Sequence, residues 1–252
     1  MSDFKDIFGS AMAIHCRGDF RGRLSVADSN PIWLRHLGGL GGQLSSDAVS
    51  GDAPSLASAV IDGHDAWRSD VTQFWEGPSA SEGLKILTSD RFSVFCVMAR
   101  LAIPGADIQA WTVDGSDFLP RTGPIFMADG RLKYAIHCDD GGSGAQAESA
   151  PIAFDGDYHA HEIHLDAGEG QGVFDGNDVV IPTGGAGAGA GYEATPGYSS
   201  LTWGAAGDIF SLGVGAAHDL VEYVLVQGAI TNAQKLAARA VLRARYPSIP
   251  IA

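Results

Sequence analysis

The sequence predicts an all-β sandwich closed by one C-terminal α-helix, and three observations support this fold class. The chain has 34 glycines among 252 residues, and only 18% of its residues are charged. Such a composition favours many short strands joined by tight turns over helical bundles or coiled coils. Residues 158–166 alternate in polarity as a half-buried strand does. Residues 232–245 have the capping signals and the spacing of an amphipathic helix.

The N-terminal segment is predicted to form a short amphipathic helix over residues 2–12. Its apolar residues recur at helical spacing: Phe4, Ile7, Phe8 and Met12. Such a helix can cap the core or bind a partner chain, and capping is the simpler interpretation. We expect residues 1–30 to form an N-terminal extension available for attachment, and residues 31–252 to form the sandwich.

The sequence between residues 14 and 73 is broken into short segments, with a glycine-rich loop at residues 38–42 and a short strand at 59–63. A stronger strand signal begins at residues 92–98, which are apolar almost throughout and therefore typical of a strand buried on both faces. The remaining strands are separated by Gly, Pro and Asp turns: residues 108–113, 125–127, 132–137, 158–166, 172–177, 179–181, 201–203, 209–214 and 220–227.

The predicted C-terminal helix begins after Thr231, which forms a capping-box pattern with Gln234. Pro247 ends it. Its apolar stripe is expected to consist of Leu236, Ala237, Ala240, Val241 and Ala244. We expect this helix to pack on the edge of the sandwich.

The charge balance excludes some classes of partner. Thirty acidic and sixteen basic residues give a net charge of −14, which disfavours nucleic acid and anionic membranes. Three cysteines without C-x-x-C spacing do not describe a disulfide framework or a zinc site. Residues 1–13 have no basic region followed by a long apolar stretch, and no run of 18 apolar residues occurs. We therefore expect assembly in the cytoplasm without a secretory signal or membrane span.

Several blocks, in this order, resemble the concanavalin A-like, or laminin-G-like, jelly roll found in virion proteins of phages and gene transfer agents. The blocks are residues 33–41, 54–56, 61–65, 158–166, 172–176, 201–204, 220–226 and the closing helix after residue 230. The resemblance implies a jelly-roll β-sandwich with a C-terminal helix over most of the chain. It implies fold better than function, because this fold carries lectins, glycosidases, adhesion modules and structural proteins.

A row of polar residues, Glu162, His164 and Asp166, occupies one face of the alternating strand. Similar glucanases use carboxylates at such i and i+4 positions. A retaining pair needs its carboxyl groups about 5–5.5 Å apart, whereas four residues of regular strand span about 13 Å, so a bulge is required. The middle histidine and the final aspartate also depart from the glucanase pattern. We therefore expect a solvated sheet face and no catalytic residues.

His159 and His161 lie on the other face of the same strand, at a spacing that suits metal ligation. Because Ile163 and Leu165 share this face, the histidines are expected to border the core instead.

Two acidic loops offer oxygen ligands of the kind that calcium prefers: Asp114, Asp117, Asp139 and Asp140. Related lectins and laminin-G modules often carry calcium at the rim. Turn formation by Asp-Gly is the plainer explanation, so calcium is an optional ligand and no cofactor is required.

Aromatic residues in loops are the best candidates for glycan contacts, because the C–H faces of sugars stack on rings. The candidates are Trp67, Trp75, Trp111, Tyr192 and Tyr198. The alternative is that most tryptophans fill the core.

These features predict a virion surface protein, a spike or a fibre, that binds cell-surface or capsular polysaccharide and is not an enzyme. It is expected to form a homo-oligomer, to contact other virion proteins, and to reach the virion surface without a secretory signal. Two alternatives stay open: a glycoside hydrolase or lyase on the same fold, and a purely structural particle protein.

Overall fold

The computed structural model describes fourteen segments of the chain. They are residues 3–19, 33–34, 44–45, 55–69, 75–76, 91–103, 108–109, 111–113, 122–138, 145–153, 155–166, 169–181, 210–212 and 217–252. The described strands form two sheets in which every pairing is antiparallel, and the all-β prediction is confirmed.

The first sheet has eight strands in the order β16-β15-β14-β7-β18-β5-β4, with β1 also paired to β18. Because β18 is long, β7 runs along one side of it, and β5 and β1 share the other side. The bounds are β1 Met12–Arg17, β4 Ser55–Ile61, β5 His64–Ser69, β7 Arg91–Arg100, β14 Tyr158–Asp166, β15 Glu169–Phe174, β16 Asn177–Val179 and β18 His218–Gln227.

The second sheet has ten strands in the order β12-β11-β10-β9-β17-β6-β3-β2, with β13 paired to β11 and β8 to β10. The bounds are β2 Trp33–Leu34, β3 Leu44–Ser45, β6 Trp75–Glu76, β8 Ile108–Gln109, β9 Trp111–Val113, β10 Thr122–Phe126, β11 Arg131–Cys138, β12 Ala145–Glu148, β13 Ile152–Ala153 and β17 Phe210–Leu212. The predicted strand at residues 201–203 and the loop at 38–42 lie outside the described residues.

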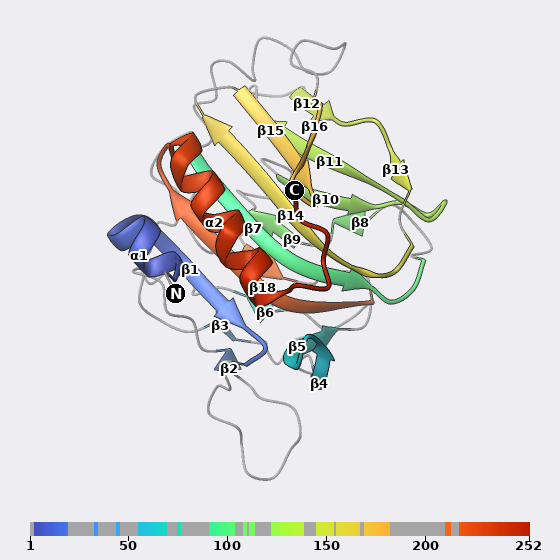
Figure 1. The fold of residues 1–252 in the computed structure, drawn as a ribbon. Coiled ribbons are helices and arrows are strands. Elements are labelled where there is room, and N and C mark those ends of the chain that lie inside the picture. Colours follow the sequence, from blue (N-terminus) through green and yellow to red (C-terminus); the bar gives the residue numbers. More distant parts are fainter. Residues whose placement is uncertain are drawn as a thin grey trace.

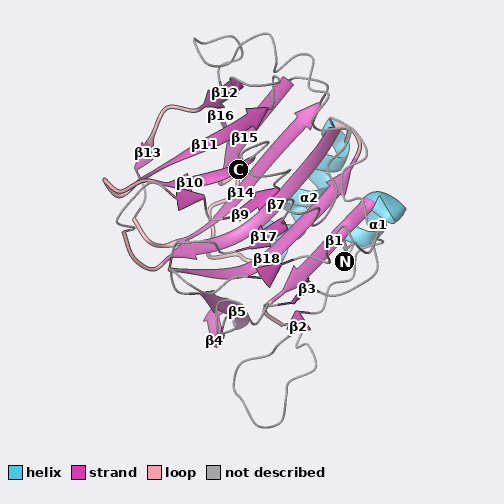
Figure 2. Cartoon of the chain, turned by 180° about the vertical axis from the view of Figure 1, so that it is seen from behind, coloured by secondary structure: helices cyan, strands magenta, loops and turns pink. Residues whose placement is uncertain are grey.

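The eight-stranded sheet is the middle of three layers. Figure 1 shows helices α1 (Phe4–Phe8) and α2 (Asn232–Arg245) in front of it, and Figure 2 shows them behind it when the molecule is turned around. Phe95 and Ala160 point to the helices and share a buried cluster with Leu242. On the opposite face, the Tyr134 hydroxyl of β11 lies 3.0 Å from Nδ1 of His161. Both faces of this sheet are therefore buried.

The capping of α2 is confirmed, but its predicted position on the edge of the sandwich is wrong. The Thr231 side chain accepts a hydrogen bond from the backbone of Gln234, as the capping box requires. The helix covers the face of the eight-stranded sheet, because that face is apolar and needs a cover. Its buried residues are Ala238, Val241 and Leu242, whereas Leu236 of the predicted stripe is 58% exposed.

The N-terminal segment up to Arg17 is part of the sandwich. Phe4 and Phe8 of α1 belong to the same buried cluster as α2. A 3₁₀ turn, Gly9–Ala11, then leads into β1, which pairs with β18 more than 200 residues later in the chain. The sequence analysis predicted no strand here, because the partner that makes this strand favourable is remote in sequence. A role of residues 1–30 in attachment stays a prediction.

Two Asp-Gly turns close hairpins of the eight-stranded sheet. Asp62 and Gly63 join β4 to β5, and Asp175 and Gly176 join β15 to β16; all four have positive φ, as type I′ turns require. The bounds of β14 are as the sequence predicts, and the strands predicted at residues 172–177 and 179–181 form the second hairpin but lie two to three residues earlier, at Glu169–Phe174 and Asn177–Val179. Cys16 and Cys96 are buried free thiols.

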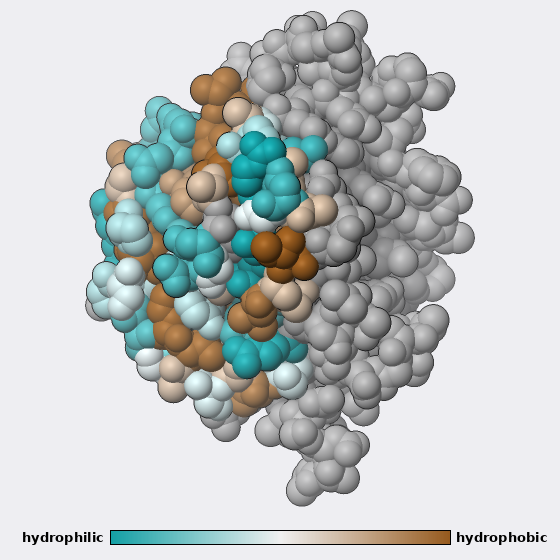
Figure 3. Space-filling view, turned by 90° about the vertical axis from the view of Figure 1, so that its right-hand side faces the viewer, coloured by the Kyte–Doolittle hydropathy of each residue, from teal (hydrophilic) through white to brown (hydrophobic). Residues whose placement is uncertain are grey.

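The surface of the described part has a mixed character. Hydrophobic residues in the view of Figure 3 form small patches separated by hydrophilic ones. Among the residues that the structure describes, no helix is long and apolar enough to cross a membrane.

Candidate functional site

A pocket of about 450 Å³ opens at one edge of the sandwich, between the β15–β16 hairpin and the segment that leads into β13. This volume lies within the range of small-ligand sites. The pocket is lined by Ala150, Pro151, Ile152, Phe174, Asn177, Asp178, Val179 and Val180. Because β13 belongs to one sheet and β16 to the other, the pocket lies between the two layers.

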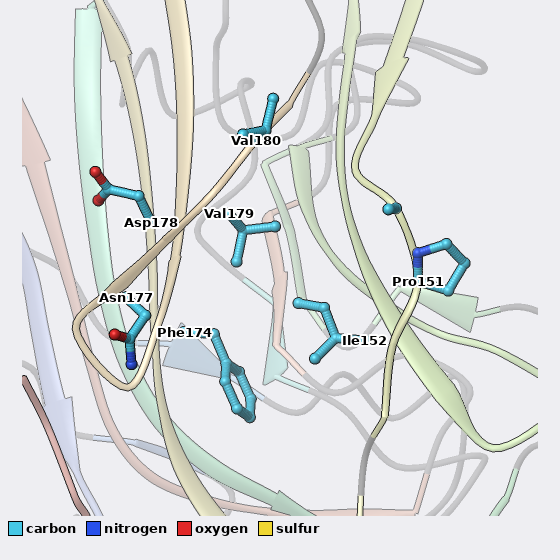
Figure 4. A pocket seen from close by; sticks show the side chains of 8 residues that line it. Pro151, Ile152, Phe174, Asn177, Asp178, Val179 and Val180 are labelled. Atoms are coloured by element: carbon cyan, nitrogen blue, oxygen red, sulfur yellow. The ribbon is translucent and has the colours of Figure 1, made fainter.

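The hairpin determines which side chains face the pocket. Figure 4 shows Phe174, Val179 and Ile152 pointing toward one another, whereas Asp178 is turned away from them. The alternation of a strand explains this difference, since neighbouring side chains point to opposite faces. The Asp178 carboxylate accepts a hydrogen bond of 2.9 Å from the Gln171 amide on the adjacent strand. The interior of the pocket is therefore apolar.

Two carboxylates flank His159, whose ring contacts the pocket residue Phe174. The His159 ring packs against the Phe174 ring at a centroid distance of 4.5 Å. Its Nδ1 donates to Asp175 at 2.7 Å and its Nε2 to Asp155 at 2.9 Å. Burial alone lowers the pKa of His159, but the hydrogen bonds with Asp175 and Asp155 outweigh it and raise the pKa. A protonated ring, with a donor on each nitrogen, satisfies both carboxylates.

The C-terminus supports the same hairpin. The backbone N–H of Ala252 donates to the carbonyl of Asp175 at 2.8 Å. A Cβ on Gly176 would lie 2.5 Å from the backbone of Ala252, so only glycine fits there. The Asp175 carboxylate also accepts the backbone N–H of Ala160 at 2.8 Å. Contacts with Ala160 and Ala252 thus fix the turn beside the pocket.

The Glu162, His164 and Asp166 row is not a solvated face, and this expectation is wrong. Glu162 is fully buried beneath α2, where Arg239 donates to both carboxylate oxygens at 2.8 and 3.1 Å. His164 Nε2 donates to the same carboxylate at 3.0 Å, and the Ser93 hydroxyl lies 2.9 Å from Nδ1. Asp166, at the end of the strand, is exposed and pairs with Arg91 at 3.1 Å. The two carboxylates therefore have different surroundings.

A second buried carboxylate, Glu222 of β18, lies beneath the other end of α2. It accepts hydrogen bonds from His15 at 2.6 Å and from the Tyr246 hydroxyl at 2.8 Å, and it pairs with Arg245. Burial alone raises the pKa of Glu222, but His15, Arg245 and Arg17 lower it to about 2. No local pattern in the sequence predicts this network, because its members come from β1, β18 and the C-terminal end of α2.

His159 and His161 of β14 are buried, as predicted. Tyr134 donates to the carbonyl of Val173 at 2.9 Å, so His161 Nδ1 donates to the Tyr134 hydroxyl. Burial, together with the nearby charge of His159, lowers the pKa of His161 to about 3. Within the described part of the chain, no group of three or more His, Cys, Asp or Glu could hold a metal ion.

The structure separates the aromatic candidates. Trp67 is only 1% exposed, and its indole N–H donates to the carbonyl of Arg17 at 3.3 Å. Its ring fills space beside β1 and offers no face to a sugar, so Trp67 is corrected to a core residue. Trp75 and Trp111 lie in β6 and β9 of the second sheet. Tyr192 and Tyr198 lie outside the described residues.

The acidic candidates for calcium lie outside the described residues: Asp114, Asp117, Asp139 and Asp140. The pocket residues, in contrast, were missed by the sequence analysis. The available signal was Phe174 directly before the Asp175–Gly176 turn, since an aromatic residue at a hairpin tip lies near the end of a sheet.

The comparisons with known proteins show the fold alone. No family model matches the sequence, and no curated protein does. Trypanosoma rangeli sialidase in complex with sialic acid has a TM-score of 0.51 at 10% identity, over 90% of this chain and 32% of that one. The botulinum neurotoxin serotype D binding domain has a TM-score of 0.56 at 5% identity, over 95% of this chain and 53% of that one.

A third similar structure is the binding domain of botulinum neurotoxin DC in complex with SialylT. It has a TM-score of 0.53 at 7% identity, over 93% of this chain and 52% of that one. The chain thus spans about a third of the sialidase and about half of the neurotoxin domains. At these identities the likeness shows that the chain has a β-sandwich fold shared with these proteins.

Proposed function

We propose that this protein binds cell-surface or capsular polysaccharide, without catalysis, as a spike or fibre of a phage-like particle. The observation that carries the proposal is the open pocket at the sandwich edge, with the Phe174 ring inside it and Asn177 at the hairpin tip. A ring for the C–H face of a sugar and an amide for its hydroxyl groups are suited to a carbohydrate. Hydrogen bonds from Ala160 and Ala252 to Asp175 fix the turn of the hairpin that presents them, and such preorganisation reduces the entropy lost on binding.

Two further observations favour a sugar ligand. Trypanosoma rangeli sialidase, which shares the fold over 32% of its length, was solved in complex with sialic acid, although fold alone does not determine function. The net charge of −14 disfavours nucleic acid as the alternative polymer. The virion location, the contacts with other virion proteins and the homo-oligomer rest on the resemblance of the sequence blocks. Calcium at the acidic loops is an optional part of the proposal.

The state of the buried carboxylates supports a role without catalysis. Glu162 binds Arg239 and His164, and Glu222 binds Arg245, Tyr246 and His15. Most glycosidases use two carboxyl groups that flank the glycosidic bond, although sialidases use a tyrosine nucleophile. Both of these carboxylates are fully buried and already bound to cations, so neither is offered to a substrate.

A glycan array tests the proposal, with the purified full chain and the variant Phe174→Ala. Leu236→Ala is the matched control, because Leu236 is an exposed apolar residue on α2. We expect the wild type and Leu236→Ala to bind the same polysaccharides and Phe174→Ala to lose at least tenfold in affinity. Circular dichroism must show that the variant is folded. An empty array would contradict glycan binding and favour a structural particle protein.

Two other measurements test the remaining parts. Release of reducing ends from a bound polysaccharide would favour the hydrolase, and a rise in absorbance from unsaturated products would favour the lyase. Immunogold labelling of purified particles should place the protein on their surface. Labelling confined to soluble material would contradict the virion location.

A further inference from the structure

We infer that the edge pocket selects a neutral sugar that bears an apolar substituent, such as an acetyl or methyl group, over a carboxylated sugar. This inference rests on the proposed glycan binding at the same pocket. It concerns the part of the sugar that enters the pocket, and three properties of the lining residues carry it.

The first property is the apolar interior. The side chains that meet in Figure 4, Phe174, Ile152 and Val179, carry no hydrogen-bonding groups. A hydroxyl group placed among them loses its hydrogen bonds to water and gains none, which is unfavourable. A methyl group placed there loses nothing of this kind and buries apolar surface. An unsubstituted hexose has hydroxyl groups around its ring and therefore fits this interior poorly.

The second property is the absence of a cation among the eight lining residues. A carboxylate in a protein site is normally bound by arginine or lysine. Lys235 of α2 is bound to the strand next to the pocket, because its Nζ donates to the Gln171 side chain at 2.8 Å. Gln171 in turn donates to Asp178, the one charged residue of the lining. The lining residues therefore offer no cation to a carboxylated sugar, although a fold neighbour was solved with sialic acid.

The third property is the polar rim. Asn177 is exposed at the hairpin tip, and its amide donates to the carbonyl of Asp175 at 3.3 Å. An amide at the mouth of an apolar pocket can bind ring hydroxyl groups while the substituent lies inside. A sugar that is polar on one side and apolar on the other matches this arrangement.

Binding of four small probes tests the inference, measured by chemical shift changes in the full chain: the free sugars N-acetylglucosamine, fucose, glucose and glucuronic acid. We expect the acetylated and deoxy sugars to bind at least about fourfold more tightly than glucose, the ratio for one buried methyl group. Glucuronic acid should bind most weakly. The changes should include the methyl signals of Val179 and Ile152.

Two variants make the preference specific to the pocket. Val179→Asn and Ile152→Asn place a hydrogen-bonding group inside, so each should reduce the ratio between N-acetylglucosamine and glucose toward one. Leu236→Ala should leave the ratio unchanged. An equal affinity for all four probes, or a preference for glucuronic acid, would overturn the inference while leaving glycan binding intact.

An apolar peptide probe, N-acetyl-leucine amide, separates this failure from the failure of the proposed function. If this probe binds at Val179 and none of the four sugars does, the pocket takes a protein side chain and the inference is overturned. If polysaccharides also fail on the array, the proposed function falls as well. Polysaccharide binding on the array without any effect at the pocket would show that the sugar site lies elsewhere.

Discussion

The face of the eight-stranded sheet beneath α2 and the edge of the sandwich differ in how their side chains are covered. Beneath α2, two glutamates are fully buried, and each is bound by an arginine from the helix. At the edge, the pocket is apolar inside and remains open, with Val180 78% exposed. The charged groups beneath α2 are paired with each other and shielded from solvent, whereas the edge pocket exposes apolar side chains to solvent.

This difference indicates where a ligand can act. A buried carboxylate that is already paired with arginine contributes to the docking of the helix, and removing one partner is costly. An apolar pocket that the chain itself does not fill is a typical location for a ligand. The polar row on β14 that the sequence offers as a candidate site therefore lies in a region that stabilises the fold. The inconspicuous hairpin provides the candidate site.

The largest expected effect comes from breaking the helix-covered network. Glu222→Gln removes the buried charge that Arg245 and His15 share, and Arg245 then pairs with the partly exposed Asp3. We expect a loss of about 3–5 kcal/mol in the free energy of unfolding, measured by urea denaturation. Asp166→Asn is the control, since its pair with Arg91 is exposed and contributes less than about 1 kcal/mol. Equal effects of the two variants would contradict the role of burial.

The second prediction separates the two leucines of α2. Leu242→Ala leaves a cavity in the buried cluster and should cost about 2–5 kcal/mol of stability. Leu236→Ala changes an exposed residue of the same helix and should stay within about 0.5 kcal/mol. Both are measured in the same denaturation assay. A larger effect at Leu236 would restore the stripe that the sequence predicts and place the helix in another orientation.

The third prediction concerns the edge and compares two Asp-Gly turns. Gly63→Ala imposes only the cost of a positive φ, about 1 kcal/mol, because nothing lies within 4 Å of the new Cβ. Gly176→Ala has the same cost, and its Cβ also clashes with the backbone of Ala252. We expect a total of about 2–4 kcal/mol, with release of the C-terminus from the turn. Hydrogen exchange at the Ala252 amide should accelerate in Gly176→Ala alone.

The smallest expected effect is a dependence of stability on pH, and it differs in sign between His161 and His159. The pKa of His161 in the folded state is about 3, below its usual value of 6.5, because burial disfavours the charged ring. The unfolded chain therefore binds the extra proton, and stability falls as pH falls below 6.5. One such proton changes the free energy of unfolding by about 1.4 kcal/mol per pH unit. Burial also lowers the pKa of His164, so it acts in the same direction.

Two variants test this assignment between pH 4.5 and 8.5. His161→Phe should reduce the slope of the free energy of unfolding against pH, between pH 5 and 6, by up to the contribution of one proton, about 1.4 kcal/mol per pH unit. His159 has a raised pKa, so its contribution is complete below pH 6.5 and is lost as pH rises through the higher value. His159→Gln should therefore leave the slope between pH 5 and 6 unchanged and reduce the loss of stability at higher pH. The reverse pattern would exchange the roles of the two histidines.

The sequence by itself determined the elements that depend on local signals. The strand predicted from the alternation of residues 158–166 and the cap predicted at Thr231 and Gln234 each depend on neighbours a few residues apart, and each is confirmed in the structure. These signals, with the excess of glycine, were sufficient to predict an all-β sandwich with one closing helix.

Only the tertiary structure determined what covers each face of the eight-stranded sheet. Glu162 was expected in solvent because alternation shows that a side chain leaves the sheet, but not what covers it. The cover is α2, more than 60 residues later, and Arg239 from that helix makes the burial of Glu162 favourable. The pocket likewise combines Ile152 and Phe174 from different sheets. Contacts between remote segments depend on packing and charge pairing in three dimensions, which no local pattern records.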